Sequence, residues 1–160
     1  MHTTYKPMLK IISSIFFAII LALLPLEEVF ACKCASGETK QSRFNKADYV
    51  AHVKITAAEL RDASELSNAD DLFREGYVRV SFEEIEVIKG EKFSPTFLTE
   101  LPFTDGNCTL GLRPGWEYVI FLAKESNGFV FGCSGSFPLY NDGDVTTKIQ
   151  ELREWAKGKQ

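Results

Sequence analysis

The chain has 160 residues and a formal net charge of −4, with 25% charged and 12% aromatic residues. Lys and Arg are not clustered anywhere in the sequence, which makes nucleic acids and anionic membrane surfaces poor partners. Residues 32–160 are enough for one domain with a substantial hydrophobic core.

The first 31 residues have the pattern of a secretory signal peptide. Lys6 and Lys10 give a basic start, residues 11–24 form an almost unbroken apolar run, and the small residue Ala31 stands at the expected cut. The apolar run is too short for a comfortable membrane span, which needs about 20 residues. We therefore predict cleavage after Ala31 and a secreted, extracellular or periplasmic domain.

Cleavage after Ala31 would make Cys32 the first residue of the mature chain. Bacterial lipoproteins are also cut just before a cysteine, which then carries acyl chains. Here the bulky Phe30 stands where a small residue is usual, and residues 25–28 form a polar spacer before the cut. These features favour an unacylated Cys32 with a free α-amine; a lipoprotein anchored through Cys32 is the alternative.

All four cysteines follow the expected cut: Cys32, Cys34, Cys108 and Cys133. An even number of cysteines in an exported chain indicates disulfides. Cys32 and Cys34 are too close to pair without strain, so each is expected to reach Cys108 or Cys133. A soft-metal site is the weaker alternative, because the exported part has only one histidine, His52, and no methionine.

Alternation of apolar and polar residues predicts strands at 49–56, 77–87, 96–101, 116–122 and 129–133. The doubled Glu83-Glu84 indicates a β-bulge in the second strand, and Asn127-Gly128 indicates a tight hairpin before the last. Residues 61–75 read as a long polar loop, and residues 134–144 as a Gly/Pro/Asn-rich connection. The segment 36–46 reads as a loop or a short helix.

One amphipathic helix is predicted at the C-terminal end, because Val145, Ile149, Leu152 and Ala156 recur at helical spacing. Asp144 or Thr147 can cap it. Together these elements predict a mainly β fold, a five-stranded Greek-key OB-fold barrel with a C-terminal amphipathic helix. Phe131 and Ile149 are expected in the core under that helix.

No set of residues has the spacing of a catalytic site. Residues 132–136 resemble a nucleophile elbow only superficially, because the spacing differs and no histidine partner other than His52 is present. Glu83, Glu84 and Glu86 could act as acid and base, but a solvated strand edge explains them better. We therefore expect neither enzymatic activity nor a cofactor.

Several stretches together resemble the netrin-like module. They are the Cys32-x-Cys34 start, Ala-Asp-Tyr-Val-Ala at 47–51, Val-Ile-Lys-Gly at 87–90, Tyr-Val-Ile-Phe-Leu at 118–122 and Cys-Ser-Gly-Ser-Phe-Pro-Leu at 133–139. In order and spacing they resemble the N-terminal domains of the tissue inhibitors of metalloproteinases. The resemblance covers nearly all of residues 32–155, and the Cys-x-Cys start after a signal cut is its most specific part.

The resemblance implies an OB barrel with the disulfides Cys32–Cys108 and Cys34–Cys133. In these inhibitors the α-amine and carbonyl oxygen of the first cysteine chelate the catalytic zinc of an extracellular metalloprotease, and Cys32 holds that position here. The implied inhibitory ridge comprises Cys32, Lys33, Cys34, Ala35 and Ser36, with Asp105, Gly106, Asn107 and Cys108 beside it.

The sequence also departs from the family. Lys33 stands where an apolar or small residue usually fills the S1′ pocket of the protease, and its charge would be costly to bury without a partner. Residues 35–37 lack the usual proline, and the third disulfide and the C-terminal domain are absent. The alternative function is a non-inhibitory netrin-like module that binds another extracellular protein, with or without a lipid on Cys32.

Overall fold

The computed structural model describes Cys34, Phe73 and residues 37–66, 75–91, 96–104, 107–140 and 144–158. The chain divides into two compact units, Met1–Phe30 and Ala31–Gln160, and all the described residues belong to the second. The predictions of a signal peptide over residues 1–31 and of a free α-amine on Cys32 lie outside the described residues. Within the described part, no helix is long and apolar enough to cross a membrane.

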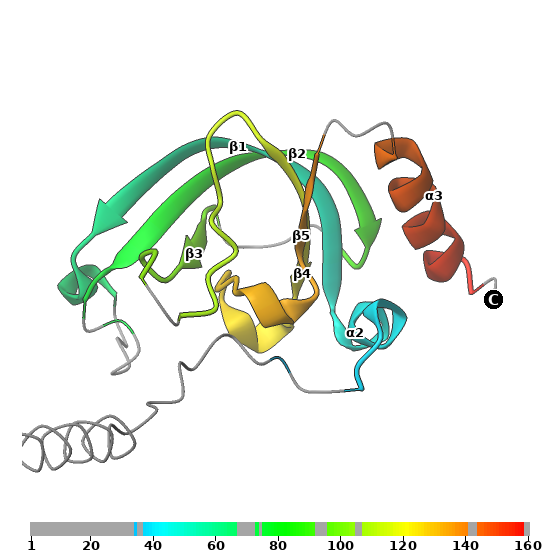
Figure 1. Ribbon diagram of the computed structural model, residues 1–160, viewed down its shortest axis with the longest axis horizontal. Helices are drawn as coiled ribbons and strands as arrows, with labels where there is room; N and C mark the ends of the chain where they lie inside the picture. Colours follow the sequence, from blue (N-terminus) through cyan, green and yellow to red (C-terminus); the bar gives the residue numbers. More distant parts are fainter. Residues whose placement is uncertain are drawn as a thin grey trace, which may run out of the picture. The chain divides into compact units, whose positions relative to one another are not determined.

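Five antiparallel strands of the described chain form one sheet (Figure 1). They are β1 (Tyr49–Arg61), β2 (Tyr77–Lys89), β3 (Leu98–Glu100), β4 (Glu117–Leu122) and β5 (Phe137–Leu139). The helices are α2 (Lys40–Lys46) and α3 (Val145–Ala156), with the short 3-10 helices η1 (Ala63–Glu65), η3 (Lys124–Ser126) and η4 (Gly132–Ser134). The predicted mainly β class with a C-terminal helix is confirmed.

The strand order β3-β2-β1-β4-β5 contains a Greek key, because β4 returns to lie beside β1 after three consecutive strands. The sheet is not closed into a full barrel. Its β3 edge is joined to the chain after η3 by one parallel bridge, between Thr99 and Phe129. The structure is therefore a curled, partly open Greek-key sheet.

The pairing of β1 with β2 shifts register three times, and the middle shift corresponds to the predicted bulge. His52 pairs with Glu86 and Val53 with Glu84, so Ile85 has no partner in this ladder. The bulge thus lies one residue beyond the predicted Glu83-Glu84 doublet. Ile85, the extra residue, is 47% exposed. Extra residues bend a strand, and Figure 1 shows both long strands strongly curved.

β4 is buried on both faces, as its two interleaved apolar sets predicted. Tyr118, Ile120 and Leu122 pack in the core enclosed by the curled sheet. Val119 and Phe121 pack in a second core, which also contains Phe44, Leu139, Ile149 and Leu152. The second core joins the sheet to both helices, so β4 connects the two halves of the hydrophobic interior.

The predicted strand at 129–133 is wrong. Asn127 adopts a left-handed conformation with φ 48° after η3, and the chain then makes only the Thr99 bridge before entering η4. Val130 is fully buried, whereas Phe131 is 39% exposed and does not lie in the core. The fifth strand is β5, in the stretch expected to be a connection. The strand was missed in the sequence because of Pro138. Proline lacks the backbone N–H that a sheet ladder needs, and within sheets it is found mainly on edge strands.

Both helices begin where capping chemistry allows. The Thr39 side chain accepts a hydrogen bond from the Ser42 N–H at 3.1 Å, so segment 36–46 contains a helix rather than only a loop. Asp144 occupies the N-cap position of α3, and its carboxylate pairs with Lys148 at 3.5 Å. Ile149 is 4% exposed, which confirms its expected core position.

Candidate functional site

A disulfide joins Cys34 to Cys133, as the resemblance implied, with the two Cα atoms 5.3 Å apart. Cys108 is also disulfide-bonded, while the predicted pairing with Cys32 falls outside the described residues. The described part of the chain holds no free cysteine and no group of three or more His, Cys, Asp or Glu residues able to hold a metal. The described cysteines therefore offer no thiolate to a soft metal.

The chain around Cys108 runs beside η4. The Gly132 N–H donates a hydrogen bond to the Cys108 carbonyl oxygen. A Cβ on Gly132 would lie 3.1 Å from that oxygen, so only glycine fits this approach without displacing a neighbour. Cys34 and Cys108, which belong to the two arms of the predicted ridge, are thus both attached to residues 132–133.

The other described member of the predicted ridge, Asn107, closes a turn. Its side-chain amide donates to the Pro102 carbonyl oxygen, and its backbone N–H donates to the Thr104 carbonyl at 3.4 Å. Phe103 projects from this turn with 82% of its surface exposed. The six remaining ridge residues lie outside the described residues: Cys32, Lys33, Ala35, Ser36, Asp105 and Gly106.

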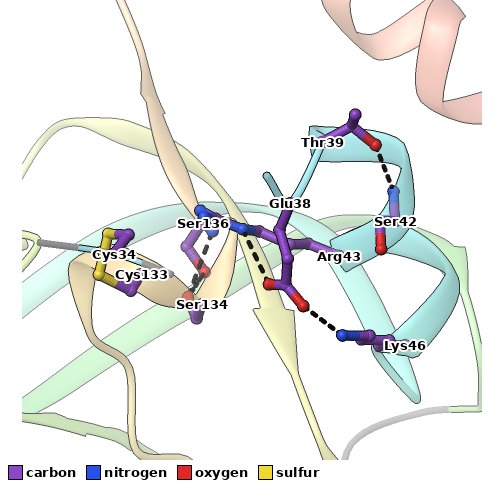
Figure 2. Close-up of polar contacts among 9 residues, drawn as sticks. All are labelled: Cys34, Glu38, Thr39, Ser42, Arg43, Lys46, Cys133, Ser134 and Ser136. Atoms are coloured by element: carbon purple, nitrogen blue, oxygen red, sulfur yellow. Dashed lines mark hydrogen bonds and ion pairs between the residues drawn. A yellow bond between two sulfur atoms is a disulfide. The ribbon is translucent and has the colours of Figure 1, made fainter. Parts of the chain in front are cut away.

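The segment between Cys34 and α2 is anchored by Glu38 (Figure 2). Its carboxylate lies between Lys46, to which it is hydrogen-bonded, and the Arg43 Nε at 3.5 Å. The hydrogen bond from Lys46 is the main reason that the pKa of Glu38 is lowered. The start of the described chain is thereby held at one end by the disulfide and at the other by α2.

The Cys133 side of the disulfide is anchored to β4. The Ser136 hydroxyl accepts a hydrogen bond from the Phe121 N–H at 2.8 Å. The Ser134 hydroxyl also donates to it, at 2.8 Å, and Figure 2 shows this contact between the two serines. Gly135 has φ 101°, and a Cβ there would lie 2.8 Å from the Phe121 ring. The two serines thus attach η4 to β4, while the His52 side chain bonds to Glu117 at 2.8 Å.

A shallow depression of about 180 Å³ adjoins the disulfide. It is lined by Phe121, Phe129 and Phe131, by Cys133 and Ser134, and by the Glu38, Arg43 and Lys46 group. Phe129 and Phe131 stack with their ring centroids 6.0 Å apart. Phenylalanine and arginine side chains, which are enriched in protein interfaces, therefore lie together on the surface beside the disulfide.

Two of the three glutamates considered as acid and base, Glu84 and Glu86, have separate partners. Glu84 accepts a hydrogen bond from the Tyr49 hydroxyl at 2.5 Å, and burial together with this bond raises the pKa of Tyr49. Glu86 binds the Arg153 guanidinium through two hydrogen bonds of 2.8 and 2.7 Å. These contacts stabilise the surface of β2 and do not form an acid–base pair.

One residue near the site was missed in the sequence. Glu100 ends β3, is only 3% exposed and accepts hydrogen bonds from the segment that follows Cys108. In the sequence, an acidic residue two positions after the apolar Leu98 in a predicted strand is only a weak sign of a buried carboxylate. Its partners come from another part of the chain, so no local pattern could reveal the contact.

The sequence matches no known protein family, and it matches no curated protein. The likeness to netrin-like modules therefore rests on the residues quoted above.

Proposed function

We propose that this chain is the precursor of a secreted inhibitor of zinc metalloproteases, with Cys32 as the first residue of the mature protein. The main support is the attachment of both cysteine arms to η4. Cys34 is bonded to Cys133, and Cys108 accepts a hydrogen bond from Gly132. Two segments remote in the sequence are thereby held beside one another, as a rigid binding ridge would require.

The proposed chemistry is chelation of the protease's zinc by the backbone of Cys32. A catalytic zinc keeps one coordination position open for water or substrate. An α-amine has a pKa of about 7.7–8.0, so a useful fraction is neutral near pH 7.5 and able to ligate. Because Cys34 is covalently fixed two residues later, little chain freedom remains to be lost on binding.

Lys33 would set the specificity of such an inhibitor. As the residue after the chelating cysteine, it would enter the S1′ pocket, where an unpaired ammonium is costly to bury. The pocket that suits it carries a carboxylate or remains hydrated. Lys33→Thr removes the charge and would extend inhibition to apolar or small pockets.

The proposal is tested with a panel of zinc endopeptidases whose S1′ pockets differ in charge and size. The mature protein is expected to inhibit at least one protease with an acidic or open pocket. Lys33→Thr is expected to extend inhibition to proteases with apolar pockets. If neither protein inhibits any member of the panel, the proposed inhibition is wrong.

A second candidate is an extracellular binding module that does not contact zinc. It is favoured by a pair of exposed aromatic residues, Trp116 and Tyr140, which are 39% and 51% exposed. Their rings meet edge to face at 5.6 Å and line a cavity of about 440 Å³ with Leu139 and Val145. Exposed aromatic residues are enriched in protein interfaces. Such a module would function equally with Cys32 acylated.

The intact mass of the exported protein helps to separate the two candidates. A mass equal to residues 32–160 with two disulfides means that the α-amine is free, as zinc chelation requires. A mass increased by acyl chains excludes chelation and leaves only the binding module.

A further inference from the structure

The three-residue strand β3 is bonded to the chain that leads to Cys133. The Thr99 N–H donates to the Gly128 carbonyl at 2.9 Å, and the Thr99 carbonyl accepts from the Val130 N–H at 2.7 Å. Val130 is fully buried. The backbone of β3 thus fixes the position of residues 128–130, which lead into η4.

The next residue of β3 is bonded to the chain that follows Cys108. Both Glu100 carboxylate oxygens are used: Oε1 accepts from the Leu112 N–H at 2.8 Å, and Oε2 accepts from the Gly111 N–H at 3.0 Å. The Thr109 hydroxyl also donates to Oε2, at 2.8 Å. Hydrogen bonds to an ionised acceptor are stronger than neutral ones, so this carboxylate holds three successive parts of the loop.

The far end of the same loop is held by a buried tyrosine. The Tyr118 hydroxyl donates to the Gly111 carbonyl and accepts from the Arg113 N–H, both at 3.0 Å. Tyr118 is 1% exposed and lies on β4 in the main core. The loop is therefore fixed from two core strands, and Glu100 supplies the contact on the Cys108 side.

Glu100 is unusual because it holds a loop with a buried carboxylate. Glu100 is only 3% exposed, and no basic side chain of the described residues forms an ion pair with it. A buried carboxylate is costly unless its acceptors are satisfied, and here backbone and hydroxyl donors satisfy them. Removing the charge would therefore weaken all three bonds to the loop at once.

We propose that Glu100 is a positioning residue for the inhibitory ridge. Together with Thr99, it sets the placement of the Cys108 segment relative to the Cys133 segment, and both segments support the proposed chelating end of the chain. This inference rests on the proposed function. Glu100 lies in the interior and does not touch the protease, so it acts only through the geometry of the ridge.

The test compares Glu100→Gln with Glu86→Gln as a matched control. Both substitutions neutralise a hydrogen-bonded carboxylate, but Glu86 pairs with Arg153 on α3, away from the cysteine segments. Hydrogen exchange of the Gly111 and Leu112 amides reports on the loop, and the inhibition constant reports on the ridge. Both are measured on the disulfide-bonded mature protein.

Glu100→Gln is expected to speed exchange of the Gly111 and Leu112 amides at least tenfold beyond the change at Val130, and to weaken inhibition at least tenfold. Glu86→Gln should change neither the exchange of the Gly111 and Leu112 amides relative to Val130 nor the inhibition constant. Unchanged loop exchange, or faster loop exchange with full inhibition, would overturn the positioning role. If the wild-type protein inhibits no protease, the proposed function fails, and the exchange result still decides whether Glu100 fixes the loop.

A second variant covers the case in which Glu100→Gln does not fold. Thr109→Val removes one of the three donors and keeps the side-chain shape. It is expected to change loop exchange and inhibition in the same direction by a smaller factor. Wild-type values in both measurements for a folded Thr109→Val protein would count against the inference.

Discussion

The Gly132 N–H donates to the carbonyl oxygen of Cys108, a residue 24 positions earlier in the chain. Because a Cβ at position 132 would lie 3.1 Å from that oxygen, any other residue there would have to move the Cys108 carbonyl by a few tenths of an ångström. Cys133 follows directly and is bonded to Cys34. One backbone contact thus brings the cysteine segments of the candidate site together.

Phe103 is expected to be an interface residue of the inhibitor. It is 82% exposed on the turn that Asn107 closes just before Cys108. Phe103→Ala should weaken inhibition about tenfold or more, as truncating an aromatic anchor typically does, and leave the free energy of unfolding nearly unchanged. Leu60→Ala is the matched control, since Leu60 is 68% exposed on β1. Equal inhibition by both variants would place Phe103 outside the interface.

The disulfides are expected to be Cys32–Cys108 and Cys34–Cys133. Peptide mapping of the non-reduced protein should recover both pairs. Replacing Cys34 and Cys133 together by alanine should destabilise the fold by about 3–4 kcal/mol, because with Cys32–Cys108 in place this bridge still closes a loop of roughly 27 residues. Two free thiols in the exported protein, or crossed pairing, would contradict the resemblance at its most specific point.

The second hydrophobic core should be sensitive to changes in α3. Ile149 is 4% exposed and packs with Phe44 and Phe121. Ile149→Ala should lower the free energy of unfolding by about 2–5 kcal/mol, through lost burial and the cavity that remains. The neighbouring Gln150 is exposed, so Gln150→Ala is the control for helix propensity. Equal shifts in chemical denaturation would mean that α3 does not cover this core.

Part of this fold could be read from local patterns. β4 was predicted correctly because each of its faces is apolar, and α3 because Ile149 and Leu152 recur at helical spacing. Phe129 and Phe131 alternate like a strand, yet only Val130 is fully buried there. The conformation of that segment depends on the bridge to Thr99, which is a contact between distant parts of the chain.

The candidate site, like the fold, could be predicted only in part from the sequence. The Cys34–Cys133 pairing came from the resemblance, whereas composition and spacing left the pairing open. Glu100 could not be found because its donors lie on a loop whose path depends on Tyr118 and β4. A charged residue in a strand sequence indicates an exposed edge unless the tertiary donors are known.

Stability should fall in acid partly through Glu86. The hydrogen bonds from Arg153 lower the pKa of the Glu86 carboxyl in the folded protein. The unfolded chain, with a glutamate pKa of about 4.3, then takes up the proton first as pH falls. The stabilisation is therefore full above about pH 4.3 and is lost as pH falls through the lowered folded pKa.

Glu86→Gln should accordingly reduce stability near pH 7 and flatten its decline at lower pH. The denaturation midpoint in urea, measured at several values between about pH 2.5 and 7, gives both quantities. Glu83→Gln serves as the control, because Glu83 is an exposed residue of the same strand. Parallel curves for wild type and Glu86→Gln would show that the Arg153 contact does not stabilise the protein in solution.

Zinc chelation by Cys32 is tested most directly by changing only its α-amine. One extra alanine ahead of Cys32 converts the nitrogen into an amide, which ligates zinc poorly, and leaves residues 32–160 unaltered. The inhibition constants of the native and extended proteins are measured against the same protease, after denaturation curves have shown equal stability. We expect the extension to weaken inhibition by two orders of magnitude or more. Equal inhibition by the extended protein would contradict zinc chelation and leave the binding module as the function of this chain.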